Sequence, residues 1–95
     1  MKTFNYEIIV PERLDASFIL TCRIPLATQT DAPHILSYLR SQQLKEDVHH
    51  TWMIKNAANY GMEVRGGPRP VFESSNDRAS PVVAYECDFR IAQRI

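Results

Sequence analysis

Three segments of the chain alternate apolar and polar residues with a period of two, and this pattern constrains the fold more than any other feature. In residues 3–10, 17–26 and 81–92, every second side chain is apolar. Successive side chains of a β-strand point to opposite faces of a sheet, so each segment predicts a strand with one face on a core. One-sided strands favour an antiparallel sheet, because strands of a parallel sheet are buried on both faces and read as continuous apolar runs.

The first two segments are joined by residues 11–16, a length that suits a β-hairpin with a longer loop. The apolar residues that share a face in each segment are even-numbered, whereas Ile9 and Ile19 lie on the opposite face. We therefore expect even-numbered residues to pair with even-numbered ones, because a slip of one residue would turn an apolar face to water. Cys22 and Cys87 fall on the apolar faces. In a cytosolic protein this predicts two reduced core thiols rather than a disulfide.

Residues 31–60 change to a helical period. An apolar stripe at helical spacing is formed by Ala32, Ile35, Leu36 and Leu39. A single helix from there to Tyr60 would be about 45 Å long, whereas a domain of this size is about 30 Å across. The sequence therefore predicts a break near residues 42–47 and a second helix from about Asp47 to Tyr60, with Gly61 as its C-cap.

The predicted second helix has two apolar faces. One carries Met53, Ala57 and Tyr60, and the other carries Leu44, Val48 and Trp52. One face is expected to meet the sheet, and the other needs cover from the first helix or from a partner. Trp52 is the most informative of these residues, since tryptophan is enriched at interface hot spots. The alternative is that the first helix packs over it, because large apolar side chains are usually buried.

The remaining segment contains the strongest turn signal in the chain, Gly-Gly-Pro-Arg-Pro at residues 66–70. We expect a short strand at 62–65 before this turn, a brief edge strand at Val71–Glu73 after it, and an exposed loop from Ser74 to Ser80. The element order is then β-β-α-α-β-(β)-β. This order predicts a single α+β domain over residues 1–95, with an antiparallel sheet of three to five strands and two helices packed on one face.

Charge is balanced along the chain, with 11 basic and 11 acidic residues and no basic or acidic tail. The outer positions of the predicted strands place Glu86 and Asp88 near Arg23 and Arg90, which is typical of a solvated face with cross-strand ion pairs. No apolar run approaches the roughly 18 residues that a membrane span needs, and the first residues do not resemble a signal peptide. We expect a cytoplasmic protein with no membrane contact.

The histidines and cysteines do not form a recognisable metal motif. His49 and His50 are adjacent, so on a helix they point about 100° apart, and Cys22 and Cys87 lie on the predicted core face. No phosphate-binding loop, nucleophile elbow or dinucleotide fingerprint occurs in the sequence. The sequence therefore predicts no metal, no cofactor and no catalytic residue.

By elimination, the sequence predicts a small non-enzymatic binding protein that acts through protein–protein contact. The expected contact residues lie on the second helix and around the glycine-proline turn: Leu44, Val48, His49, Trp52, Arg65 and Arg69. Proteins of this size include inhibitors, adaptors, regulatory modules and phage-encoded modulators of bacterial defence complexes, such as anti-CRISPR proteins. No residue of the sequence selects among these roles.

Alternatives to this interpretation stay open. The chain would be a nucleic-acid-binding module if the outer sheet face and the Arg65–Arg69 loop contacted phosphates. It would be an undetected small enzyme if His34, His49 or His50 lay in a deep pocket beside a carboxylate. A homodimer is a further option, since an exposed edge strand or an uncovered tryptophan would let two copies pair.

Overall fold

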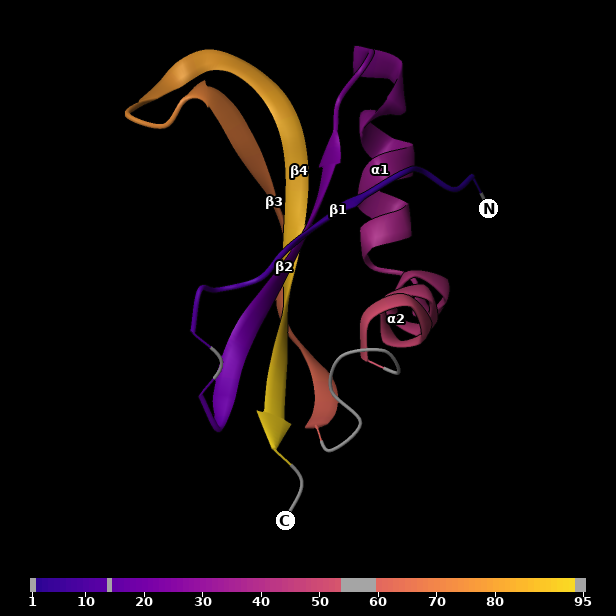
Figure 1. The fold of residues 1–95 in the computed structure, drawn as a ribbon. Coiled ribbons are helices and arrows are strands. Elements are labelled where there is room, and N and C mark those ends of the chain that lie inside the picture. Colours follow the sequence, from indigo (N-terminus) through magenta and orange to yellow (C-terminus); the bar gives the residue numbers. More distant parts are fainter. Residues whose placement is uncertain (1, 14, 54–59, 94–95) are drawn as a thin grey trace.

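The computed structural model describes residues 2–13, 15–53 and 60–93. The strands are β1 (Glu7–Ile9), β2 (Ser17–Pro25), β3 (Tyr60–Ser74) and β4 (Asp77–Gln93). The helical elements are a 3₁₀ turn η1 (Gln29–Asp31), α1 (Ala32–Leu39), α2 (Gln42–Val48) and a π-helical turn η2 (His49–Met53) that continues α2. The strands form one antiparallel sheet in the order β1-β2-β4-β3, and both α-helices lie on one side of it (Figure 1). The predicted α+β architecture is confirmed.

The strand register follows the hydrophobic alternation. Even-numbered residues of β1 pair with even-numbered residues of β2, as in Ile8 with Cys22. Cys22 is also paired with Cys87 of β4, so two of the predicted core positions face the helices side by side. The buried side chains form a single cluster between sheet and helices: Phe18, Leu20, Cys22, Ile24, Ile35, Tyr38, Leu39, Leu44, Val48, Cys87, Phe89 and Ile91. The predicted even-with-even register of the first hairpin is confirmed, and so are the core faces except at Val10 and Val83, which are exposed.

Both cysteines are buried and reduced. Its hydrogen bond to the Cys87 sulfur and its burial raise the pKa of the Cys22 thiol. Tyr38 is the other titratable side chain in the core, and its hydroxyl donates to Asp47 Oδ2 at 3.0 Å. Burial and this contact with Asp47 raise the pKa of Tyr38, so these groups stay neutral inside the domain.

The first strand is shorter than the sequence predicts. The alternation extends from residue 3, whereas β1 includes only Glu7–Ile9. The residues before it contact α1 and the turn η1 that precedes it: the Phe4 ring lies 6.1 Å from the ring of Tyr38 in α1, and Lys2 Nζ lies 3.0 Å from Asp31 Oδ1 in η1. The apolar side chains of this segment therefore serve the helix layer as well as the sheet.

The predicted second helix, from Asp47 to Tyr60, is wrong at both ends. The break between the helices lies at residues 40–41, and α2 begins directly afterwards. Ser41 caps α2, because its Oγ accepts from the Leu44 N–H at 3.1 Å. Residues 54–59, which include Ala57, lie outside the described part of the chain, as do the side chains of Met53 and Tyr60. Gly61 lies in β3 and is not a helix cap.

The glycine-proline segment is part of a strand and not a turn. β3 runs without interruption to Ser74, and only residues 75–76 separate it from β4. Register shifts on either side of Gly66 and on either side of Phe72 absorb the irregular backbone as bulges. Pro68 and Pro70 are tolerated because β3 is an edge strand. The predicted exposed loop from Ser74 to Ser80 is instead a short turn followed by the first residues of β4. Together β3 and β4 form a long hairpin, whose end curves away from the helices (Figure 1).

Candidate functional site

The side of α2 and η2 that is turned away from the core lines an open groove. Its polar side chains follow the helical spacing i, i+3, i+4, i+7 and i+8: Gln42, Lys45, Glu46, His49 and His50. Met62 of β3 lines the same groove, which has a volume of about 420 Å³. We call this hollow the α2–β3 groove. It lies at the boundary between the helix layer and the edge of the sheet.

The opposite side of α2 is part of the core. Leu44 and Val48 are both 0 % exposed. Their predicted role as contact residues is corrected, because the domain's own core covers them and leaves no surface for a partner. These two side chains instead fix which face of α2 is turned outward, since a residue one position later on a helix points about 100° away. They thereby direct Lys45 and His49 into the groove.

Trp52 is half-buried in the π-helical turn η2. Its ring packs edge-on against Phe18 of β2, with the ring centroids 5.7 Å apart and the ring planes at 68°. Part of the Trp52 side chain is thus covered by the sheet itself, and not only by the first helix or a partner. Substituting Trp52 would disturb a core contact, so Trp52 is a poor probe of an interface.

The three histidines are exposed: His34 on α1, and His49 and His50 beside the groove. Within the described residues, no three His, Cys, Asp or Glu side chains are grouped so that they could hold a metal ion. The groove is an open hollow that brings His49 and His50 near Glu46. Such a site can donate hydrogen bonds to a bound carbonyl or carboxylate group.

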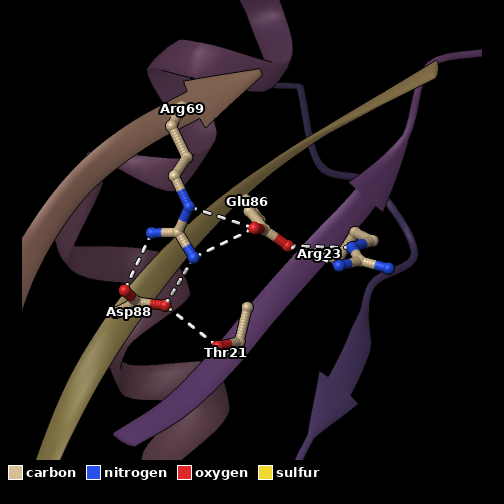
Figure 2. A network of polar contacts seen from close by, with 5 residues as sticks. All are labelled: Thr21, Arg23, Arg69, Glu86 and Asp88. Atoms are coloured by element: carbon tan, nitrogen blue, oxygen red, sulfur yellow. Dashed lines mark hydrogen bonds and ion pairs between the residues drawn. The ribbon is translucent and has the colours of Figure 1, made fainter. Parts of the chain in front are cut away.

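The outer sheet face carries a network of charged contacts, shown in Figure 2. We call it the outer-face network, and its members come from β2, β3 and β4: Thr21, Arg23, Arg69, Glu86 and Asp88. Arg69 donates through Nη1 and Nη2 to the two oxygens of Asp88, at 2.8 and 3.0 Å. Its Nε donates to Glu86 Oε1 at 3.0 Å. Arg69 was predicted to contact a partner from a turn, but its guanidinium is bound within the domain.

Glu86 is the centre of this network. Its side chain is only 11 % exposed, although no described helix covers the outer face. Arg23 of β2 donates through Nε to Glu86 Oε2 at 2.9 Å, from the side of β4 opposite to Arg69. Thr21 Oγ1 donates to Asp88 at 2.9 Å. The hydrogen bonds to Asp88 and, to a smaller extent, the charge of Glu86 raise the pKa of Arg69. The guanidinium therefore stays charged, and its contacts help to hold the three strands together.

The outer face offers little free positive charge in the described part of the structure. Arg23, Arg69 and Arg90 each contact a carboxylate, with Arg90 reaching Glu63 at 3.3 Å. The sequence predicted cross-strand ion pairs on this face without assigning partners, and the structure pairs Arg23 with Glu86 in register and contact. Arg65 belongs to β3, and its side chain lies outside the described part of the structure.

Only His49 among the groove residues was predicted as a contact residue; those not predicted are Gln42, Lys45, Glu46, His50 and Met62. The helical spacing of the polar side chains was readable, but a helix start placed at Asp47 divided the set. Met62 was assigned to a strand, and its place beside α2 depends on the tertiary fold.

The described helices include none long and apolar enough to cross a membrane. No family model matches the sequence, and no similar protein is found among curated proteins or solved structures.

Proposed function

We propose that this chain is a small non-enzymatic binding protein that contacts a protein partner through the α2–β3 groove. The observation that carries the proposal is the groove itself, a hollow of about 420 Å³ with polar walls and an apolar side chain at Met62. Interfaces of this kind combine an apolar anchor with a polar rim that sets orientation. Inhibitor, adaptor and phage-encoded modulator roles are all compatible with such a surface.

The helix wall of the groove favours a protein partner. Lys45 donates hydrogen bonds as a charged group, Glu46 accepts them, and the two imidazoles can do either. Buried Leu44 and Val48 hold this wall in place, so a partner would meet a preformed surface. Preformed surfaces bind with a smaller loss of side-chain freedom than flexible ones.

Nucleic-acid binding through the outer sheet face is less well supported by the contacts. A phosphate would have to compete with Glu86 or Asp88 for Arg69, and with Glu63 for Arg90. Affinity for nucleic acid depends on how many phosphates a protein neutralises. A protein partner is therefore the hypothesis that the groove and the network together favour.

Affinity capture from a cell lysate, read by quantitative mass spectrometry, tests the proposal. The baits are the wild-type domain, the double variant Lys45→Glu/His49→Ala, and Arg78→Glu as a matched control on the exposed hairpin end. We expect at least one protein to be retained by wild type and control and lost with the double variant. Nuclease treatment separates direct capture from capture through nucleic acid. Equal retention by all three baits would contradict a role for the groove.

A further inference from the structure

We propose that Cys22 and Cys87 close into a reversible disulfide between β2 and β4 when a low-molecular-weight disulfide, oxidised glutathione, acts on the domain. This bond is a redox switch that stabilises the fold in its oxidised state. It goes beyond the proposed function, because no residue of the α2–β3 groove takes part in it. Both cysteines hold free thiols in the structure, which is the reduced state of the switch.

The two cysteines lie at the seam between two hairpins. β1 pairs with β2, and β3 pairs with β4, so each hairpin joins strands that are neighbours in the sequence. The pairing of β2 with β4 joins these two halves of the sheet along Ser17 to Pro25, and Cys22 lies opposite Cys87 within it. Because α1 and α2 lie between β2 and β3 in the chain, a bond at this place encloses both helices in its loop.

The backbone register brings the two side chains to one place in the core. Opposite residues of an antiparallel pair carry their side chains on the same face, and Cys22 is 0 % and Cys87 2 % exposed. The Leu26 N–H donates to the carbonyl of the opposite residue, Val83, at 2.9 Å. Hydrogen-bonded and non-hydrogen-bonded pairs alternate along such a ladder, so Cys22 and Cys87, four positions away, also form a hydrogen-bonded pair.

A disulfide at a hydrogen-bonded pair can close, but only under strain. Opposite Cα atoms lie about 5.5 Å apart there, which is within the disulfide range of about 4.4–6.8 Å. The Cβ atoms lie about 5 Å apart, whereas a disulfide holds them at about 3.5–4.5 Å. The two strands must therefore shift towards each other as the bond forms. Strained disulfides are more readily reduced than relaxed ones, and this makes the bond reversible.

Two thiol–disulfide exchange steps form the bond. The Cys22 S–H donates to the Cys87 sulfur, which lowers the pKa of Cys87, so Cys87 ionises first. When the helix layer opens transiently, the Cys87 thiolate attacks one sulfur of oxidised glutathione, whose S–S bond breaks and releases a glutathione thiolate. The Cys22 thiolate then attacks the Cys87 sulfur of the mixed disulfide and releases the second. The two released thiolates take up the two cysteine protons, and the oxidant gains the two electrons that the cysteines lose.

The oxidation equilibria of the folded and the unfolded chain test the proposal. The domain is equilibrated with mixtures of reduced and oxidised glutathione in buffer and in urea, quenched with acid, alkylated and weighed by intact mass spectrometry. We expect the folded domain to lose two hydrogens as a monomer. Its oxidation constant should exceed that of the unfolded chain about tenfold or more, because the paired strands already hold the ends of a long loop together.

Urea denaturation then measures the switch itself. The oxidised domain should unfold at a higher urea concentration than the reduced domain, and excess reduced glutathione should restore both thiols and the original midpoint. The matched control is Cys22→Ala, whose midpoint oxidised glutathione should leave unchanged. A rise in that midpoint would trace the stabilisation to another effect and contradict the switch.

The wild-type comparison decides the proposal without any variant. A folded domain that stays reduced, or that carries only glutathione adducts or bonds between molecules, would rule out the disulfide between β2 and β4. An oxidation constant no greater than in urea would rule out stabilisation of the fold, and a bond that persists in excess reduced glutathione would rule out reversibility. Capture of a partner through Lys45 and His49 is a separate measurement, so the proposed function stands or fails independently.

Discussion

The two parts of β3 pair with the neighbouring strand β4 in different ways. Residues 60–64 pair with β4 in unbroken register, whereas four register shifts occur between Val64 and Ser74. The regular part lies beside α2 and η2, and Met62 packs against the core. The bulged part is held from the outer face by Arg69, which binds Glu86 and Asp88.

This difference shows two ways to fix a strand in a sheet. Regular pairing needs only ladder hydrogen bonds and an apolar face, because a slip would expose that face. A bulged stretch loses part of its ladder, so specific side-chain contacts must hold its position. The domain uses charged contacts for that purpose and leaves the regular edge uncovered by any other described strand.

Substitution of the central carboxylate should have the largest effect on the bulged part. Glu86→Ala is expected to lower the free energy of unfolding by about 2 kcal/mol, because it leaves two guanidinium groups near each other without their shared acceptor. Urea denaturation measures the change. The control is Glu63→Ala, which removes a pair exposed by 63 % and 49 % and should cost less than about 0.5 kcal/mol. Equal losses would show that the network does not hold the strand.

Removal of the arginine should be milder and more local. Arg69→Ala is expected to lower the free energy of unfolding by about 1 kcal/mol, since the side chain is 44 % exposed and water can solvate the remaining carboxylates. Arg69→Lys should restore less than half, because lysine cannot bind two oxygens in a fork. Hydrogen exchange should accelerate at Val71 and Phe72 and stay unchanged at Gly61 and Met62. Uniform acceleration along β3 would contradict separate control of its two parts.

The regular part should respond to packing and not to charge. Met62→Ala is expected to lower the free energy of unfolding by somewhat less than about 1 kcal/mol, because the side chain is only partly buried. Met62→Leu should be close to neutral, and thermal denaturation compares the two. The β3–β4 register, read from cross-strand nuclear Overhauser contacts, should not change. A register shift in Met62→Ala would mean that this side chain, and not the ladder, sets the pairing.

The smallest effect is expected within the bulge itself. A Cβ built on Gly67 has no neighbouring heavy atom within 4 Å, and the backbone there is not in the left-handed region. Gly67→Ala should therefore raise the free energy of unfolding by about 0.5 kcal/mol, since it restricts the unfolded chain more than the folded one. Calorimetry resolves this change. A decrease in stability would show that the bulge needs glycine for a reason other than space.

The sequence by itself determined which faces of β2 and β4 are turned to the core, and it determined the even-with-even pairing of β1 with β2. Their alternation is local, and a slip of one residue would expose the apolar row from Phe18 to Ile24, so the face turned to the core is favoured without knowledge of the rest of the fold. The same pattern predicted that Cys22 and Cys87 lie in the core and that Arg23 lies on the outer face with Glu86 and Asp88.

Only the tertiary structure decided the boundaries of α2, the continuity of β3 and the place of Arg69. Ser41 and the burial of Leu44 set the start of α2, and no periodicity near Asp47 could reveal a cap several residues earlier. Glycine and proline favour turns locally, but pairing with β4 and the contacts of Arg69 with two carboxylates stabilise a bulged strand there. Long-range contacts outweigh a local preference of about 1 kcal/mol, which is why this segment could not be assigned from its own residues.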